Sequence, residues 1–500
     1  MHRQINRLLS GVVCLLLAAV VLTGGTTVAF ASQRELPATI PQIRVNTKDG
    51  NGVKLNKADG YVDASVSIVD GEETLEDSVQ FKVRGNTTAM TTVLKKSFTF
   101  KFAKKKNVLG MGSGKKWALV SGSFDPTLMR NYVAFDFAQE MDIPYTSNQR
   151  YVELWVDNSY RGCYLLYEPV QQGKDRVNID IESNEGKKDF LIEYEANREE
   201  EGVTYFTVDG LRFIASEPET PDREQLDYIT STMTDIINTL KTGTKEEVAE
   251  KVDLSSLVKF YLLNEYVKTF DFDMSSVFFY YQDGKLYAGP PWDYDLSSGN
   301  VNDELNSLRY RTSNDPNLVG GNKNIYRYIY NKPWFLSMVA EEYYKHKDYI
   351  AAIYADNGFM DTVKNTYWRA FNDNYTKTDW KVSRWWINIQ KKPLPTYDEN
   401  YNYLKNWYSD RHKWLAKYLG AYYTEYIIGD ADNNGVINID DVTAIQKQLA
   451  GIGDTDENFF IRAALTENVL SINDATVLQR VQAGYENLWK VGETNVIFAH

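Results

Sequence analysis

Apolar and polar residues alternate along much of the chain between about residue 37 and residue 194. A repeat of two is typical of strands that bury one face, because successive side chains of a strand point to opposite sides. The pattern therefore predicts a β-rich N-terminal lobe. The clearest segments are residues 42–45, 65–69, 79–83, 97–102, 152–156 and 162–167.

Apolar residues recur every three or four positions in the second half of the chain, which predicts helices. An earlier helix, within the β-rich lobe, is predicted to begin at Pro126. Thr220 and Pro221 have the types expected at the start of another helix, and Asp253 is the expected N-cap of a third. The helical pattern then continues from about residue 325 to Tyr423. A β-rich lobe followed by a helical lobe predicts an α+β fold.

Residues 277–288 have the pattern of a β-hairpin. Two apolar segments, 277–281 and 285–288, flank Asp283-Gly284, a dipeptide favoured in tight two-residue turns. The two strands of a hairpin lie about 5 Å apart. The residues just before and just after this hairpin should therefore meet.

Four aspartates lie at the open ends of that hairpin. Asp271 and Asp273 precede it, and Asp293 and Asp295 follow it. Carboxylates brought together repel one another unless a cation joins them, and Mg²⁺ bridging phosphates is a common solution. The spacing also matches protein kinases, in which a catalytic aspartate, a short hairpin and a metal-binding aspartate follow one another. The simpler alternative is a set of acidic loop ends with no shared function.

The first residues have the pattern of a signal peptide. Arg3 and Arg7 precede an apolar segment from Leu8 to Leu22, and Ala29-Phe30-Ala31 forms a cleavage site. We therefore expect residues 1–31 to be removed and the protein to be secreted, with no membrane anchor. Only Cys163 would then remain, which excludes a framework of disulfide bonds.

Charge and histidine content exclude several function classes. The formal net charge of −13 argues against a nucleic-acid partner. The whole chain contains only 4 histidines, so a Ser-His-Asp hydrolase or a histidine-ligated zinc enzyme is poorly supported. Any chemistry should depend on carboxylates, lysines and bound metal.

Residues 430–441 match a calcium-binding loop of 12 positions. Gly435 stands at position 6, where the loop turns sharply. The oxygen ligands at positions 1, 3, 5, 7 and 12 would come from Asp430, Asp432, Asn434, the carbonyl of Val436, and Asp441. An EF-hand normally has glutamate at position 12, so the aspartate there indicates another type of module.

The segment after this loop is repeated 33 residues later, where Ile472-Asn473-Asp474 aligns with Ile439-Asp440-Asp441. Positions 1 and 3 of the second loop hold Ala463 and Leu465, which offer no side-chain oxygen. We therefore expect one metal, with the second half held by packing. The duplicated pattern resembles a dockerin, and that resemblance implies a calcium-dependent partner, the cohesin domain of a scaffold protein.

Five short motifs occur in the first three quarters of the chain. They are Arg84-Gly85-Asn86-Thr87-Thr88 with Lys95-Lys96-Ser97-Phe98, Met129-Arg130-Asn131-Tyr132, Tyr160-Arg161-Gly162-Cys163-Tyr164, Glu168-Pro169, and Trp292-Asp293-Tyr294-Asp295. With these motifs in the same order as in that family, residues 38–375 resemble the CotH family of spore-coat-type atypical protein kinases.

The CotH resemblance implies transfer of phosphate from ATP to a protein, with Mg²⁺ or Mn²⁺. Asp273 would accept the proton of the acceptor hydroxyl, with Asp271 as the alternative. Asp293, helped by Asp295, would hold the metal. Three further side chains would contact the nucleotide: Lys96, Arg84 and Glu168.

The family tends to have an asparagine four or five residues after its catalytic aspartate. Val277 and Phe278 stand there if Asp273 is catalytic. Ser275 and Ser276 stand there if Asp271 is catalytic. A serine would then replace the asparagine, or a second metal would be absent.

The sequence thus predicts four parts: a signal peptide (1–31), a CotH-like domain (38–375), a helical extension (376–423) and a dockerin (428–490). Three hypotheses for function follow. The chain is a secreted kinase docked to a cohesin-bearing assembly, a non-catalytic binding or structural component of such an assembly, or a polysaccharide-degrading enzyme that uses two carboxylates.

Overall fold

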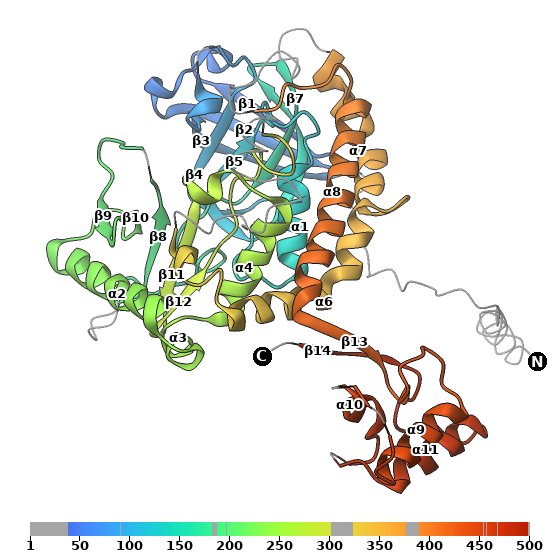
Figure 1. Cartoon of the computed structure of the whole chain (residues 1–500). Coiled ribbons are helices and arrows are strands. Elements are labelled where there is room, and N and C mark those ends of the chain that lie inside the picture. Colours follow the sequence, from blue (N-terminus) through green and yellow to red (C-terminus); the bar gives the residue numbers. More distant parts are fainter. Residues whose placement is uncertain are drawn as a thin grey trace, which may run out of the picture.

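The computed structural model describes residues 39–498, with gaps at 91, 183–187, 197, 302–323, 377–389, 454, 457 and 468. The expected signal peptide lies outside the described residues. Strands dominate the N-terminal part and helices the C-terminal part (Figure 1), which confirms the α+β class expected from sequence. None of the helices in the described ranges is long and apolar enough to cross a membrane.

The N-terminal strands close into a barrel in the order β1-β2-β3-β4-β5-β7-β6. Neighbours are antiparallel except β1 and β6, which are parallel. Apolar side chains that point inward fill it, including Phe81, Phe100 and Trp117, so the predicted alternation is confirmed. The strands are β1 (Gln42–Thr47), β2 (Val62–Asp70), β3 (Glu73–Arg84), β4 (Ser97–Asn107), β5 (Ser113–Val120), β6 (Gln149–Val156) and β7 (Ser159–Tyr167).

A second sheet, ordered β12-β11-β8-β10-β9, lies beside the barrel (Figure 1). The predicted hairpin is its β11–β12 pair, and both residues of the turn, Asp283 and Gly284, have positive φ. The strands β9 and β10 were not predicted. The sheet consists of β8 (Phe190–Tyr194), β9 (Tyr205–Val208), β10 (Leu211–Glu217), β11 (Val277–Gln282) and β12 (Lys285–Ala288).

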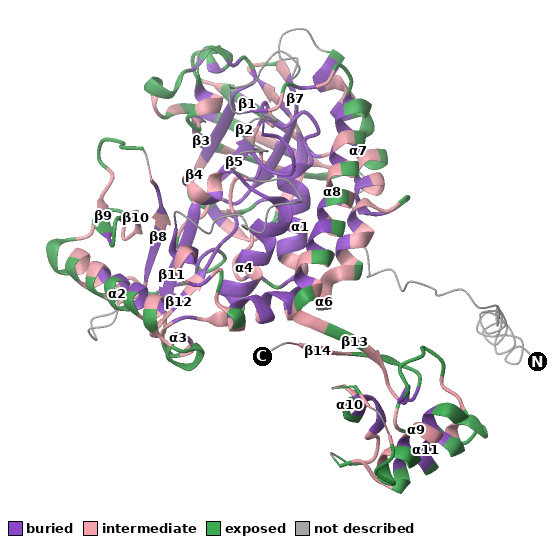
Figure 2. Ribbon diagram, viewed as in Figure 1, coloured by how far each residue is buried: buried purple, intermediate pink, exposed green. Residues whose placement is uncertain are grey.

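Helices pack around α1 and α4, which are largely buried (Figure 2). One apolar cluster joins them, and it includes Leu404 and Leu415 of α8, so α8 belongs to the core of the same body. The helices of this body are α1 (Arg130–Glu140), α2 (Arg223–Thr242), α3 (Lys245–Lys251), α4 (Leu254–Val267), α6 (Pro333–Tyr354), α7 (Phe359–Thr376) and α8 (Tyr397–Leu419).

Two helices begin later than their sequence signals indicated. Leu128 has φ +60°, a left-handed conformation that a helix cannot include, so α1 begins at Arg130 and not at Pro126. The backbone N–H of Arg130 donates to Asp125 instead. Helix α2 begins at Arg223, because the N-cap is Asp222 and not Thr220. The predicted cap at Asp253 is confirmed.

The C-terminal segment forms a small helical unit with its own apolar core. It contains α9 (Ile439–Leu449), α10 (Phe459–Ala463) and α11 (Ile472–Gln482). The strand before it, β13 (Tyr423–Ile427), pairs with the strand after it, β14 (Thr494–Phe498), so the two ends of the unit are joined. This pairing was not predicted. The ring of Tyr344 on α6 lies 5.1 Å from Tyr423 and 5.9 Å from Phe498, which ties the pair to the body (Figure 1).

Candidate functional site

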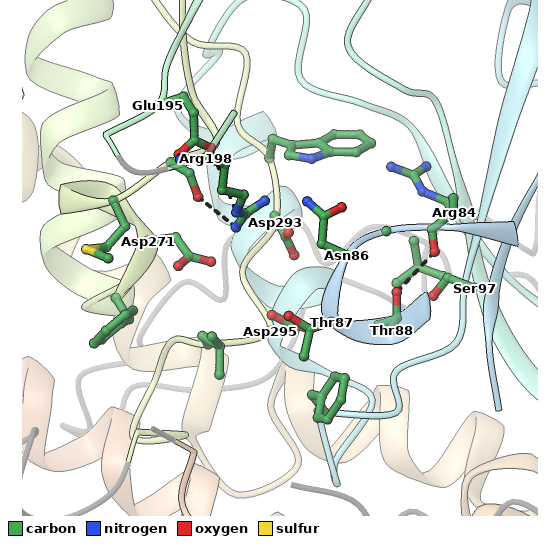
Figure 3. A pocket seen from close by; sticks show the side chains of 18 of the residues that line it. Arg84, Asn86, Thr87, Thr88, Ser97, Glu195, Arg198, Asp271, Asp293 and Asp295 are labelled. Carbon is green, nitrogen blue, oxygen red and sulfur yellow. Dashed lines mark hydrogen bonds and ion pairs between the residues drawn. The ribbon is translucent and has the colours of Figure 1, made fainter. Parts of the chain in front are cut away.

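A cavity of about 240 Å³ opens where the barrel faces the second sheet and the segments around it. Four stretches form most of its walls: the turn after β3, the segment after β8, the segment before the β11–β12 hairpin and the segment after that hairpin. Figure 3 shows Arg84 at one side, Asp271 and Arg198 at the other, and Asp293 between them. We call this cavity the cleft.

The turn after β3 forms the barrel side of the cleft. Gly85 has φ +85°, and a Cβ there would lie 2.2 Å from Oγ1 of Thr88, so any other residue would displace this turn. The Thr88 hydroxyl donates to the carbonyl of Arg84 at 3.2 Å and closes the turn. The guanidinium of Arg84 lies 5.0 Å from the ring centroid of Trp292, which holds the cation in the cleft.

The hairpin places three of the four predicted aspartates in the cleft. Asp271, Asp293 and Asp295 line it. Asp293 has φ +60°, an uncommon conformation that is often found at functional sites. The backbone N–H of Tyr294 donates to Oδ1 of Asn131 at 2.7 Å, so the acidic segment is attached to α1.

Without a cation, the negative charges of these three carboxylates are unfavourable, because the groups are partly removed from water and repel one another. Burial, and then the charge of Asp293, raise the pKa of Asp271 to about 7. Burial, and then Asp293 and Asp271, raise the pKa of Asp295 well above its ordinary range. Burial also raises the pKa of Asp293, although Arg84 and Arg198 act in the opposite direction. A divalent cation would relieve this repulsion, so the donor set fits a magnesium-type ion that also binds phosphate oxygens and water.

The sequence analysis missed the second basic residue of the cleft, Arg198. Its Nη2 donates to Oγ of Ser275 at 3.2 Å, and its Nε lies 3.9 Å from Oε2 of Glu195 (Figure 3). No local motif marks Arg198. It reaches the cleft because β8 pairs with β11, Tyr194 opposite Val277, which places the segment after β8 beside the segment before β11.

Three residues proposed from sequence do not line the cleft. Asp273 lies in the same 3-10 turn as Asp271 but does not line the cleft. Burial, and then the charge of Asp273, raise the pKa of Tyr194 to about 12. Nζ of Lys96 lies 3.4 Å from the carbonyl of Ala89, within the barrel's own loops. The remaining one, Glu168, forms an ion pair with Arg176 in a separate cavity.

Lys95, which precedes Lys96 in the same motif, also lies outside the cleft. Its Nζ donates to the carbonyls of Ser121 and Cys163, at 2.7 and 2.6 Å. It also donates to Oδ1 of Asn374 on α7, at 2.7 Å. The structure therefore brings Arg84, Asp271, Asp293 and Asp295 together. It leaves Lys95, Lys96, Glu168 and Asp273 outside the cleft.

The C-terminal loop holds the one group of three carboxylates, among the described residues, whose oxygens all lie within 4.8 Å of one another. These are Asp430, Asp432 and Asp441. Backbone N–H groups of Asn434 and Gly435 donate to the two oxygens of Asp430, at 3.0 and 2.9 Å. Burial, and then the charges of Asp432 and Asp430, raise the pKa of Asp441 against the effect of two backbone hydrogen bonds. The loop fits a calcium ion by its donor chemistry.

The equivalent aspartate of the second repeat is satisfied by the protein itself. Oδ1 of Asp474 accepts from the N–H groups of Leu465 and Thr466, at 2.9 and 2.8 Å, and from the Thr466 hydroxyl at 2.8 Å. Oδ2 of Asp474 accepts from the N–H and hydroxyl of Ser471. Burial raises the pKa of Asp474, but hydrogen bonds from Ser471, Thr466 and Leu465 outweigh it and lower the pKa overall.

Comparison with known proteins identifies the family of the large body. The model of the CotH kinase protein family matches residues 81–415. The match begins within β3, ends within α8 and includes every residue that lines the cleft. No curated protein matches the chain. Since the match covers more than half of the sequence, the chain belongs to the CotH kinase family.

Proposed function

We propose that the chain is an ATP-dependent protein kinase whose active site is the cleft. The observation that carries this proposal is the convergence of two guanidinium groups and three half-buried aspartates inside the region that matches the CotH kinase family. Positive groups suit phosphate oxygens, and crowded carboxylates suit a metal ion. Phosphoryl transfer depends mainly on positioning and charge stabilisation, which such a set can supply.

Each residue of the cleft has a distinct proposed role. Asp293 and Asp295 would hold Mg²⁺ or Mn²⁺, which would supply positive charge to neutralise the phosphate groups. The guanidinium of Arg84 would bind phosphate oxygens from the barrel side. Arg198 would do the same from the opposite wall. Val120, Phe124 and Leu296 also line the cleft, and their apolar side chains would contact the base of the nucleotide.

We propose Asp271 as the general base, in preference to Asp273, because Asp271 lines the cleft and Asp273 does not. The Asp271 carboxylate would accept the proton of the acceptor hydroxyl. The hydroxyl oxygen would form a bond to the γ-phosphorus as the bond from that phosphorus to the β,γ-bridging oxygen breaks, which releases ADP.

Ser275, four residues after Asp271, lines the cleft where the family tends to have a metal-binding asparagine. Its hydroxyl accepts a hydrogen bond from Arg198. A neutral hydroxyl is a weaker metal ligand than a carboxylate, so this departure supports one tightly held metal. It also keeps open a second candidate function, a non-catalytic protein that binds nucleotide without transferring phosphate.

We further propose that residues 428–490 form a dockerin that binds one calcium ion and a cohesin domain. The duplicated pattern and the clustered carboxylates of Asp430, Asp432 and Asp441 support this proposal. Asn434 and the carbonyl of Val436 would complete the ligand set. With the signal-peptide pattern, this makes the chain a secreted kinase delivered to a cohesin-bearing scaffold.

The kinase proposal is tested with the chain from residue 32 to residue 500, γ-labelled ATP, Mg²⁺ or Mn²⁺, and casein as a general acceptor. We expect label transfer by the unmodified chain and its loss in Asp271→Asn and Asp293→Asn. Asp273→Asn is the matched control, with the same change two residues from the base, and should retain transfer. Thermal stabilisation by nucleotide without transfer would support the non-catalytic candidate. If nucleotide gave no thermal stabilisation and no label were transferred, both candidate functions would be rejected.

A further inference from the structure

Basic side chains continue from the cleft along the outer face of the barrel. Val79, Phe81 and Val83 of β3 fill the barrel, so the alternate residues Gln80, Lys82 and Arg84 point outward. In the strand register, Gln80 lies opposite Lys101 of β4, and Lys101 lies opposite Lys116 of β5. We call Lys57, Lys82, Lys101 and Lys116 the basic face.

The positive charges of the basic face repel one another. Lys101 and Lys116 are directly opposed on neighbouring strands, and like charges in that position destabilise a sheet. Burial lowers the pKa of Lys82, and the charges of Lys116, Arg84, Lys57 and Lys101 lower it further. A protein with a net charge of −13 has many acidic residues that could neutralise such a group. Uncompensated repulsion of this kind is typical of a surface that binds an anion.

Few carboxylates balance this charge. Lys116 lies 3.7 Å from Glu219, and Lys57 lies 3.6 Å from Glu200, both exposed pairs that contribute little. Within the described residues, Lys82 and Lys101 form no ion pair. Their ammonium groups lie 4.5 and 5.9 Å from the ring centroid of Tyr61, which orients them without neutralising them.

The same face is hollowed and leads to the cleft. A shallow hollow of about 980 Å³ is lined by Tyr61, Gln80 and Lys101, together with Lys48 and Lys115 and a single carboxylate, Asp63. Lys57 also donates a hydrogen bond to Asn86, in the turn that lines the cleft. An extended chain lying on this face would therefore reach the cleft directly.

We propose that the basic face docks an acidic segment of the phosphoacceptor protein, so that the acceptor class is a protein whose serine or threonine is flanked by Asp and Glu. This inference rests on the proposed kinase function. A strand advances about 3.3 Å per residue, so Lys82 and the Gln80–Lys101 pair lie roughly 7 and 13 Å along β3 from Arg84. The acidic residues of the acceptor should thus lie roughly two to four residues beyond the point where the acceptor chain passes Arg84.

Binding of labelled peptides tests this proposal without any turnover. The full chain is titrated into fluorescent peptides that contain one serine flanked by four glutamates, four lysines or four glutamines, and anisotropy is measured. We expect the glutamate peptide to bind tightest and to weaken with salt. The Lys82→Glu/Lys101→Glu variant should lose about tenfold in affinity for that peptide. Lys245→Glu, the same charge reversal at an exposed position on α3, should not.

The outcomes separate the docking proposal from the kinase proposal. Equal binding of the three peptides, or equal loss in Lys245→Glu, overturns acidic docking. Loss of affinity for a fluorescent ATP analogue in Lys82→Glu/Lys101→Glu also overturns it, because the face would then serve the nucleotide phosphates. Selective binding of the glutamate peptide without phosphorylation would leave docking intact and reject the kinase. Unchanged thermal unfolding midpoints show that the variants are folded.

Discussion

Asp441 and Asp474 occupy equivalent positions in two repeats 33 residues apart, and their carboxyl groups have opposite pKa shifts. Asp441 faces two other carboxylates and its pKa is raised. Asp474 accepts hydrogen bonds from Leu465, Thr466 and Ser471, and its pKa is lowered. The carboxylates of the first repeat thus suit a cation, as proposed, whereas the aspartate of the second repeat is satisfied by hydrogen bonds from the protein.

The first prediction concerns calcium stoichiometry. Calorimetric titration of the full chain should give one calcium ion, and Asp441→Asn should weaken binding at least about tenfold, because a charged ligand is lost. Asp474→Asn should keep the calcium affinity but lower stability by about 1–3 kcal/mol, because a buried acceptor of several hydrogen bonds is weakened. Two bound ions, or loss of calcium binding in Asp474→Asn, would contradict this division.

The second prediction concerns the turn that forms the barrel side of the cleft. Gly85→Ala places a Cβ against Thr88, whereas Gly110→Ala in the β4–β5 turn meets no atom within 4 Å. Both positions have positive φ, +85° and +75°, so both variants should lose about 1 kcal/mol of stability. Only Gly85→Ala should also raise the KM for ATP, because the turn that carries Arg84 must move. A similar KM in both variants would exclude this turn from nucleotide binding.

The third prediction concerns a buried ion pair of α8. Arg411 donates to the carbonyl of Glu265 at 3.1 and 2.7 Å and pairs with the buried carboxylate of the same residue. Arg411→Met should cost about 3–5 kcal/mol, because it leaves that charge uncompensated. Lys413→Met, at a position 72% exposed on the same helix, should cost little. Chemical denaturation measures both, and equal effects would show that α8 is peripheral to the body.

The fourth prediction concerns pH. Burial lowers the pKa of His412 from an ordinary value of 6.5 to about 4, and its ring nitrogens lie 2.8 and 2.9 Å from the hydroxyls of Tyr354 and Tyr343. The folded-state pKa lies below the unfolded-state pKa. The contribution of His412 is therefore complete above pH 6.5 and is lost as the pH falls towards 4.

After allowance for partial exposure, this contribution is about 2 kcal/mol. Between pH 7 and pH 4.5, the free energy of unfolding should fall less in His412→Gln than in the unmodified chain. The glutamine can keep a hydrogen bond to one tyrosine but cannot take up a proton. An equal fall in the variant and in the unmodified chain would mean that His412 is not neutral in the folded state.

Local patterns along the sequence determined much of the fold. Alternation in residues 79–83 and 97–102 placed β3 and β4 correctly, because a barrel core demands one apolar face from each strand. The Asp283-Gly284 turn set the β11–β12 hairpin, and hairpin geometry alone brought Asp271 near Asp293 and Asp295. The clustering of Asp430, Asp432 and Asp441 was also predicted, since these residues lie within 12 positions of one another in the sequence.

Only the tertiary structure decided which basic residues reach the cleft and what lies outside it. Arg198 depends on the pairing of β8 with β11, a contact between residues 83 positions apart that no local pattern records. Nζ of Lys95 and Nζ of Lys96 donate to backbone carbonyls of the barrel and its loops, and Asp273 does not line the cleft although its neighbour Asp271 does. Periodicity specifies which side of a strand faces the core, but the neighbour of a side chain depends on the packing of distant segments.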